Sequence, residues 1–171
     1  VYPASFSLIT AANPCPCGYH GHPNRPCVCS PGQVQRYRNK LSGPLLDRID
    51  LQVWVHPINP DALVRAQQGE SSCAVRERVN AARQKQRIRH SATGVSCNAE
   101  LAGESIRKVA NPTPQAFEAL REIMERYSLS GRAWSRILKV ARTIADLENQ
   151  KSVQKSHIIE ASSFRLDLEV A

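Results

Sequence analysis

A cysteine-rich stretch near the start of the sequence has no means of building a core of its own, and this limits the folds open to the chain. Residues 14–32 hold four cysteines, five prolines and three glycines, a composition typical of loops. The cysteines form two close pairs, Cys15-Pro-Cys17 and Cys27-Val-Cys29, with nine residues between them. Two such pairs can place four thiolates at the corners of a tetrahedron, about 2.3 Å from a zinc ion. A structural zinc would supply the folding energy that this loop lacks.

Zinc is the interpretation we favour, and its alternatives stay open. One residue separates the cysteines of each pair, whereas two is the commoner number in zinc knuckles. His20 and His22 lie inside the loop and could replace one thiolate. A pair of disulfides or four idle thiols is the other reading, disfavoured where the cytosol keeps thiols reduced. Cys73 and Cys97 have no close partner in the sequence and are expected to be small core or surface residues.

Composition indicates a globular and basic chain. Of 171 residues, 42% are hydrophobic and 22% are charged, which is enough apolar material for a packed core. Lys and Arg number 23 against 15 Asp and Glu, a net charge of +8 that points towards nucleic acid or nucleotide phosphates. Aromatic residues make up only 5%, fewer than an extended base-stacking platform needs.

The sequence lacks the signals of export or membrane insertion. No apolar run approaches the ~20 residues of a membrane helix, and no basic segment with an apolar centre opens the chain. We therefore expect no membrane partner and a cytoplasmic location.

Two segments have the pattern of β-strands. Residues 5–13 form an apolar run that stops at a turn signal, Asn13-Pro14. In residues 51–55 the aliphatic side chains alternate with Gln52 and Trp54. A pair of strands leaves edges and apolar faces uncovered. We expect residues 1–57 to be the end of a larger α/β core whose upstream half is missing from this chain.

From residue 61 onward a helical period replaces the strand pattern. Asn98, Thr113, Ser130 and Ser156 stand where helices are expected to begin, and Pro114 follows Thr113 at a favoured first position. We expect a linker over residues 58–72 and an all-helical domain over 73–171, which makes the chain mainly α. The expected helices span residues 61–68, 73–90, 99–110, 113–127, 130–149 and 156–168.

The expected helix over 73–90 is strongly basic. It carries six Lys and Arg residues between positions 76 and 89, with Glu77 as the only acidic residue there. Basic side chains on one helix can hold DNA phosphates without reading base sequence. A solvated face, whose long side-chain stems cover apolar surface, is the alternative. The candidates for nucleic-acid contact are Arg83, Lys85, Arg87 and Arg89.

Three segments carry a family resemblance. FSLITAANPCPCGYHG, CVCSPGQVQRYRNKLSGPLLDRIDL and LSGRAWSRILKVARTIADLE together resemble the magnesium-chelatase-like AAA+ ATPases of the ComM type, bacterial proteins linked to natural transformation. The resemblance covers nearly the whole chain, and NPCPCG and SGPLLDRIDL are its most specific pieces. It implies the end of an AAA+ α/β core, with two strands and a zinc-type loop, followed by a helical lid. The family's phosphate-binding GxxxxGK[ST] loop has no counterpart in these residues.

The resemblance assigns catalytic roles to three residues. Asn13 matches sensor 1, which orients the attacking water and contacts the γ-phosphate of ATP. Arg48 matches the arginine finger that reaches a neighbouring subunit's nucleotide, and Arg132 matches the nucleotide-binding sensor 2 of the lid. A planar guanidinium suits the charge of a transferring phosphoryl group.

Each role has a plainer alternative. Asn13 could serve the turn before Pro14, and Arg48 could form a local salt bridge with Asp47 or Asp50. Arg132 could be a solvated side chain.

The leading functional hypothesis is an ATPase that remodels DNA, by branch migration during transformation or recombination. The full-length protein would form a ring, expected to be a hexamer, and use ATP with Mg²⁺ at subunit interfaces. This chain alone would lack ATPase activity because it has no phosphate-binding loop. A magnesium-chelatase subunit for porphyrin metal insertion and a non-enzymatic, zinc-stapled binding module are the alternatives.

Overall fold

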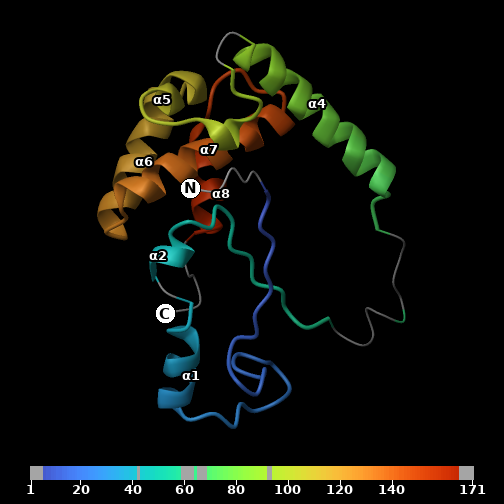
Figure 1. Cartoon of the computed structure of the whole chain (residues 1–171), viewed down its shortest axis with the longest axis vertical. Coiled ribbons are helices and arrows are strands. Elements are labelled where there is room, and N and C mark those ends of the chain that lie inside the picture. Colours follow the sequence, from blue (N-terminus) through green and yellow to red (C-terminus); the bar gives the residue numbers. More distant parts are fainter. Residues whose placement is uncertain (1–5, 42, 59–63, 65–68, 92–93, 166–171) are drawn as a thin grey trace. The chain divides into compact units, whose positions relative to one another are not determined.

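The computed structural model describes residues 6–41, 43–58, 64, 69–91 and 94–165. The chain divides into two compact units, residues 1–48 with 55–59, and residues 49–54 with 60–171 (Figure 1). Within the described residues the regular structure consists of seven α-helices and one 3₁₀ turn, η1. None of these helices is long and apolar enough to cross a membrane. Because the regular structure of the described residues is helical, the expectation of a mainly α chain is confirmed.

The first unit contains two short helices, α1 (Pro31–Arg38) and α2 (Gly43–Leu46). Helix α1 begins after Ser30 because Ser30 and Gln33 form a capping box. The Ser30 hydroxyl accepts the Gln33 N–H at 3.3 Å, and the Gln33 side chain accepts the Ser30 N–H at 2.8 Å. Cys15 and Val34 are the only buried apolar side chains among the described residues of this unit, so it has almost no apolar core.

The two expected strands are not found, because the described residues contain no β-strand. Residues 6–13 and 51–55 run without a hydrogen-bonded ladder, and Ile9 stays 94% exposed. An apolar pattern makes a strand only where a neighbouring strand completes its backbone hydrogen bonds. The described part of the chain supplies no such neighbour. The Gln52 N–H donates instead to the Phe164 carbonyl at 2.8 Å.

The second unit is a helical bundle. Its elements are α4 (Ser72–His90), η1 (Asn98–Glu100), α5 (Ser105–Ala110), α6 (Pro114–Arg126), α7 (Gly131–Leu147) and α8 (Lys155–Ser163). The expected caps at Thr113 and Ser130 are confirmed, because their hydroxyls accept the Ala116 and Ala133 N–H groups at 3.2 and 3.3 Å.

Two expected helices differ from the structure. The helix expected over 99–110 is split into η1 and α5, with Gly103 between them at a φ of +56°. Asn98 is buried inside η1, so it does not act as the expected cap. The helix expected to begin at Ser156 begins one residue earlier, at Lys155, after Gln154 at the N-cap. The short helix expected over 61–68 lies outside the described residues, apart from Val64.

Helix α7 is the centre of the bundle. Its Ile137, Leu138 and Ala141 are completely buried, and α4, α5, α8 and η1 pack against it, as the bundle in Figure 1 shows. Burial of this apolar stripe is the main stabilising term of the unit. It fixes the positions of the first turn of α7 and of the C-terminal half of α4.

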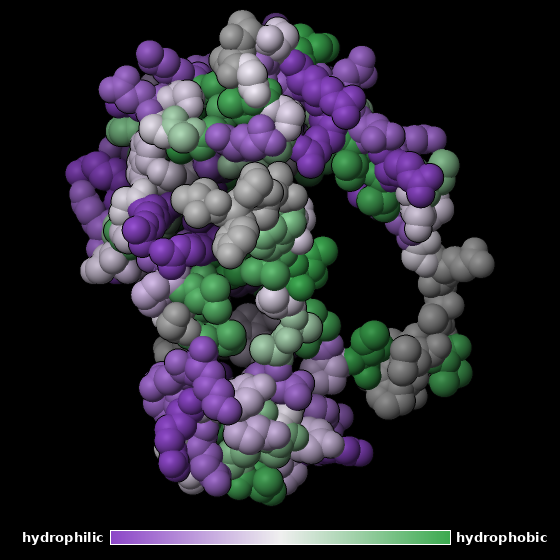
Figure 2. Space-filling view, viewed as in Figure 1, coloured by the Kyte–Doolittle hydropathy of each residue, from purple (hydrophilic) through white to green (hydrophobic). Residues whose placement is uncertain are grey.

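Only one half of α4 is packed. Ala82, Gln86 and His90 are buried in its C-terminal half, whereas every residue from 72 to 81 is exposed. Figure 2 shows hydrophilic side chains along this helix, coloured purple. Helix α4 therefore presents a basic arm on the surface of the second unit.

Candidate functional site

The four clustered cysteines come together in the first unit. The Sγ atom of Cys15 lies 3.4 Å from that of Cys17 and 3.7 Å from that of Cys27, and the Cys17 and Cys27 sulfurs are 3.5 Å apart. With Cys29 included, all four sulfurs lie within 4.8 Å of one another. A zinc tetrahedron with 2.3 Å bonds has edges of about 3.8 Å. The arrangement therefore fits one tetrahedral metal ion.

The backbone of the loop forms turns that direct N–H groups at these sulfurs. Gly18 and Gly21 adopt φ values of +82° and +77°, which glycine tolerates best, and the Gly18 N–H closes a turn on the Cys15 carbonyl at 3.0 Å. The turn aims the His20 N–H at the Cys15 sulfur, at 3.3 Å. Donation from the Tyr19 backbone N–H lowers the pKa of the Cys17 thiol to about 6, whereas burial and the neighbouring sulfurs raise the pKa of the Cys27 thiol to about 12. Amide donors of this kind favour the thiolate form that a metal requires.

The other possible ligands stand outside the cluster. All six cysteines are free thiols, which excludes the disulfide reading for this structure. The His22 Nδ1 accepts the Asn24 N–H at 3.1 Å, and His20 is exposed. Cys73 and Cys97 lie near Glu77 and Glu100, in the second unit. The four paired cysteines could therefore supply four ligands to one metal ion without a histidine.

The three residues with proposed roles at the nucleotide are all exposed. Asn13 lies in the irregular segment before the cysteine loop. Arg48 follows α2, and its Nη1 donates to the Pro44 carbonyl at 2.9 Å. Arg132 occupies the first turn of α7 in the second unit and forms no ion pair within the described part of the chain. The positive end of the α7 dipole adds to its attraction for an anion.

The four basic candidates on α4 separate into two kinds. Arg83 and Arg87 are exposed, while Lys85 and Arg89 are half-buried and turn towards α7. The Lys85 Nζ donates to the backbone carbonyl of Asp146 at 2.9 Å, and Arg89 forms an ion pair with the Asp146 carboxylate. Lys85 and Arg89 therefore hold the bundle together.

Asp146 is the centre of a buried polar network that sequence reasoning missed. It accepts hydrogen bonds from Arg89, from Arg142 at 2.9 Å and from the Asn98 side chain at 2.9 Å. Burial opposes ionisation of this carboxyl, but the Arg89 and Asn98 hydrogen bonds outweigh it and hold its pKa below the ordinary value. The signal in the sequence was the placement of Arg142 and Asp146, four residues apart, beside the apolar stripe of α7. The network locks α4 onto α7.

Fold and site together define a small helical domain preceded by a four-cysteine loop of metal-binding type. Residues 69–165 match the family described as "Magnesium chelatase, subunit ChlI C-terminal", and residues 1–63 match "Magnesium chelatase, subunit ChlI". The chain belongs to this magnesium-chelatase ChlI family.

Relatives of this chain include two proteins named YifB and one named ComM. Identity is 43% over 167 residues with YifB of Salmonella typhimurium and 41% over 167 residues with YifB of Escherichia coli. It is 39% over 167 residues with the competence protein ComM of Haemophilus influenzae. Each alignment covers 96% of this chain and 31% of the relative, so the chain spans about a third of their length. The resemblance to ComM-type proteins is confirmed.

Proposed function

We propose that this chain is the finger, sensor and lid portion of an AAA+ ATPase that acts on DNA. Membership in the ChlI family supports the ATPase part of the proposal. The observation that carries the DNA part is the set of exposed arginines left on α4 once Lys85 and Arg89 are bound to Asp146.

These arginines form one stripe. Arg76, Arg83 and Arg87 are spaced by seven and four residues, so they fall on the same face of α4. At 1.5 Å per residue the stripe extends about 16 Å, a length that matches two or three phosphates of a strand. No ion pair occupies these three side chains within the described residues. Arg78, on another face, is already paired with Glu70.

At the nucleotide, three polar groups divide the work. Asn13 orients the attacking water, Arg132 binds the γ-phosphate from the lid, and Arg48 completes the site of a neighbouring subunit in a ring. ATP with Mg²⁺ is the energy source, and closure of the lid on ATP converts hydrolysis into motion. These assignments rest on the family motifs and on the exposure of all three side chains.

Zinc is the proposed metal of the cysteine loop. A set of four thiolates with no open position is typical of structural zinc and not of catalytic zinc. Cys15, Cys17, Cys27 and Cys29 would hold it and thereby order a loop that lacks an apolar core.

DNA binding can be tested with the 171-residue chain and a labelled duplex of 20 base pairs. Fluorescence anisotropy over a range of NaCl concentrations should give a slope of log K against log salt of about −2.7, for three phosphates. Replacing Arg83 and Arg87 by Gln should reduce the slope by about two-thirds. Arg121→Gln is the matched control, since Arg121 is exposed but already paired with Glu118 and Glu125. Equal losses in both variants would refute the stripe.

ATP hydrolysis needs a protein in which this chain is joined to the nucleotide-binding core of its family. There, Arg48→Ala should leave ATP binding nearly intact and lower turnover by about 10³-fold or more, as for other arginine fingers. Unchanged turnover would make Arg48 a structural residue.

A magnesium-chelatase subunit is the second candidate function, and the descriptions of the two matching families favour it. The paired cysteines and the similarity to ComM favour the DNA motor. Stimulation of ATP turnover by DNA, and not by a porphyrin with its chelatase partners, would separate the two.

A further inference from the structure

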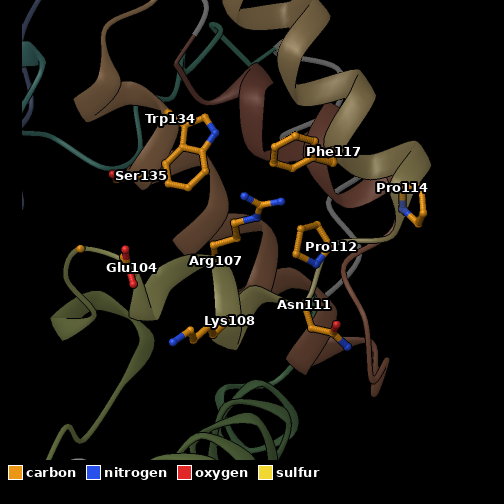
Figure 3. A pocket seen from close by; sticks show the side chains of 10 residues that line it. Glu104, Arg107, Lys108, Asn111, Pro112, Pro114, Phe117, Trp134 and Ser135 are labelled. Atoms are coloured by element: carbon orange, nitrogen blue, oxygen red, sulfur yellow. The ribbon is translucent and has the colours of Figure 1, made fainter.

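A second cationic site lies wholly within the second unit. It is a groove of about 1100 Å³ between α5, the start of α6 and the first turns of α7. Figure 3 shows Arg107 at its centre, with Phe117 and Trp134 as its walls. Lys108 and Glu104 also line it.

The centre of the groove is a cation held between aromatic rings. The guanidinium carbon of Arg107 lies 4.7 Å from the centroid of the Phe117 ring, a cation–π contact. In Figure 3 the Arg107 side chain extends from α5 into the space between Phe117 and Trp134. Arg107 forms no ion pair with a carboxylate in the described part of the chain. Its N–H donors are therefore available to an incoming ligand.

These groups select a flat, anionic ligand. An indole ring and a stacked guanidinium both offer planar faces on which a nucleobase can lie. Arg107 and Lys108 can bind the adjoining phosphate. The Glu104 carboxylate, which also lines the groove, can accept a hydrogen bond from the exocyclic amino group of a base such as adenine. The volume of about 1100 Å³ slightly exceeds the range of small-ligand pockets, about 300–1,000 Å³, and leaves room for more than one nucleotide.

We propose that this groove binds a short stretch of single-stranded nucleic acid, with one base stacked beside Trp134 and Arg107. The low aromatic content of the chain argues against an extended stacking platform, and the groove instead concentrates two aromatic residues at one place. The proposal deepens the proposed function and rests on it only in taking DNA as the partner. It adds a site for an unpaired strand that is separate from the α4 stripe.

Trp134 can report on its own groove. The chain has two tryptophans, so a Trp54→Phe background leaves Trp134 as the only one. Titration of this variant with an oligo(dA) of eight nucleotides should quench the Trp134 fluorescence in a saturable way. Arg107→Gln in the same background should raise the Kd about tenfold. Arg126→Gln is the matched control, since Arg126 also lies over an aromatic ring, that of Tyr127, at 5.5 Å and outside the groove. Its Kd should change less than twofold.

Several outcomes would overturn the strand site. They are absence of quenching, equal effects of Arg107→Gln and Arg126→Gln, equal quenching by AMP at the same nucleotide concentration, and equal quenching by poly-glutamate. Circular dichroism at 222 nm establishes that each variant is folded. Duplex binding through Arg83 and Arg87 is measured separately by anisotropy, so loss of the groove leaves the proposed function standing. Loss of duplex binding with quenching retained would refute the stripe alone.

Discussion

The two units of this chain reach order by different means. The second unit buries a continuous apolar cluster around α7, with Ile137, Leu138 and Ala141 completely inaccessible to solvent. The first unit buries only Cys15 and Val34 among the apolar side chains described. In place of a core it gathers four sulfurs within 4.8 Å. A segment without apolar mass can be organised by a metal, and the price is that its fold depends on the supply of that metal.

The largest expected effect is that of metal loss, which should disturb the first unit and leave the second unit unchanged. Cys17→Ser should lower the zinc content from about one ion per chain to near zero and leave residues 14–32 open to protease, because three thiolates do not close the tetrahedron. Cys73→Ser is the control, since Cys73 lies outside the cluster. Elemental analysis and limited proteolysis provide the measurements. The thermal unfolding of the helical unit should be the same in Cys17→Ser as in the unmodified chain. A full zinc content in Cys17→Ser would rule out the proposed site.

The next effect is confined to the second unit. Asp146→Asn should lower its free energy of unfolding by about 3–5 kcal/mol, because the buried Arg142 guanidinium would lose its counter-charge. Urea unfolding followed by circular dichroism measures the change. Glu118→Gln, in an exposed pair with Arg121, should alter the midpoint little. An Asp146→Asn variant with an unchanged urea midpoint and an unchanged zinc content would show that the network does not lock the bundle.

Acid should destabilise the helical unit through Asp146. The pKa of Asp146 is held below its ordinary value in the folded state, so its contribution is complete above the unfolded pKa and is lost as the pH falls through the folded value. We expect the helical unit to lose stability progressively below about pH 4. Urea midpoints between pH 2 and 7 follow this loss. The Asp146→Asn variant should show a flatter acid limb, and an identical limb would assign the loss to other carboxyls.

The smallest expected effect is that of removing one helix cap in the helical unit. Thr113→Ala removes the hydroxyl that accepts the Ala116 N–H and should cost about 1 kcal/mol. Thermal unfolding measures it, with Thr113→Ser as the control that keeps the hydroxyl. A loss as large in the serine variant would contradict a capping role.

Local chemistry was readable from the sequence and remote partners were not. The caps at Thr113 and Ser130 and the grouping of four cysteines depend on residues close in the chain, and the structure has them. The strands over 5–13 and 51–55 depend on neighbours that the described residues do not supply.

The division among the basic residues of α4 also depended on distant contacts. The sequence placed Lys85 and Arg89 beside Arg83 and Arg87 as equals. Arg89 and its partner Asp146 are 57 positions apart, so nothing in the local pattern could tell which cations turn inward. The groove around Arg107 and Trp134 went unseen for the same reason, because α5, α6 and α7 each contribute to it.

Among the described residues, helix α4 is clamped to the bundle only through its C-terminal half, and this gives the domain a mechanical property. Nineteen residues make a rod of about 28 Å. Its clamp, Asp146, lies near the end of α7, and Arg132 lies near the beginning of that same helix. A tilt of α7 would therefore move the N-terminal end of α4 several times further than it moves the residues at the clamp.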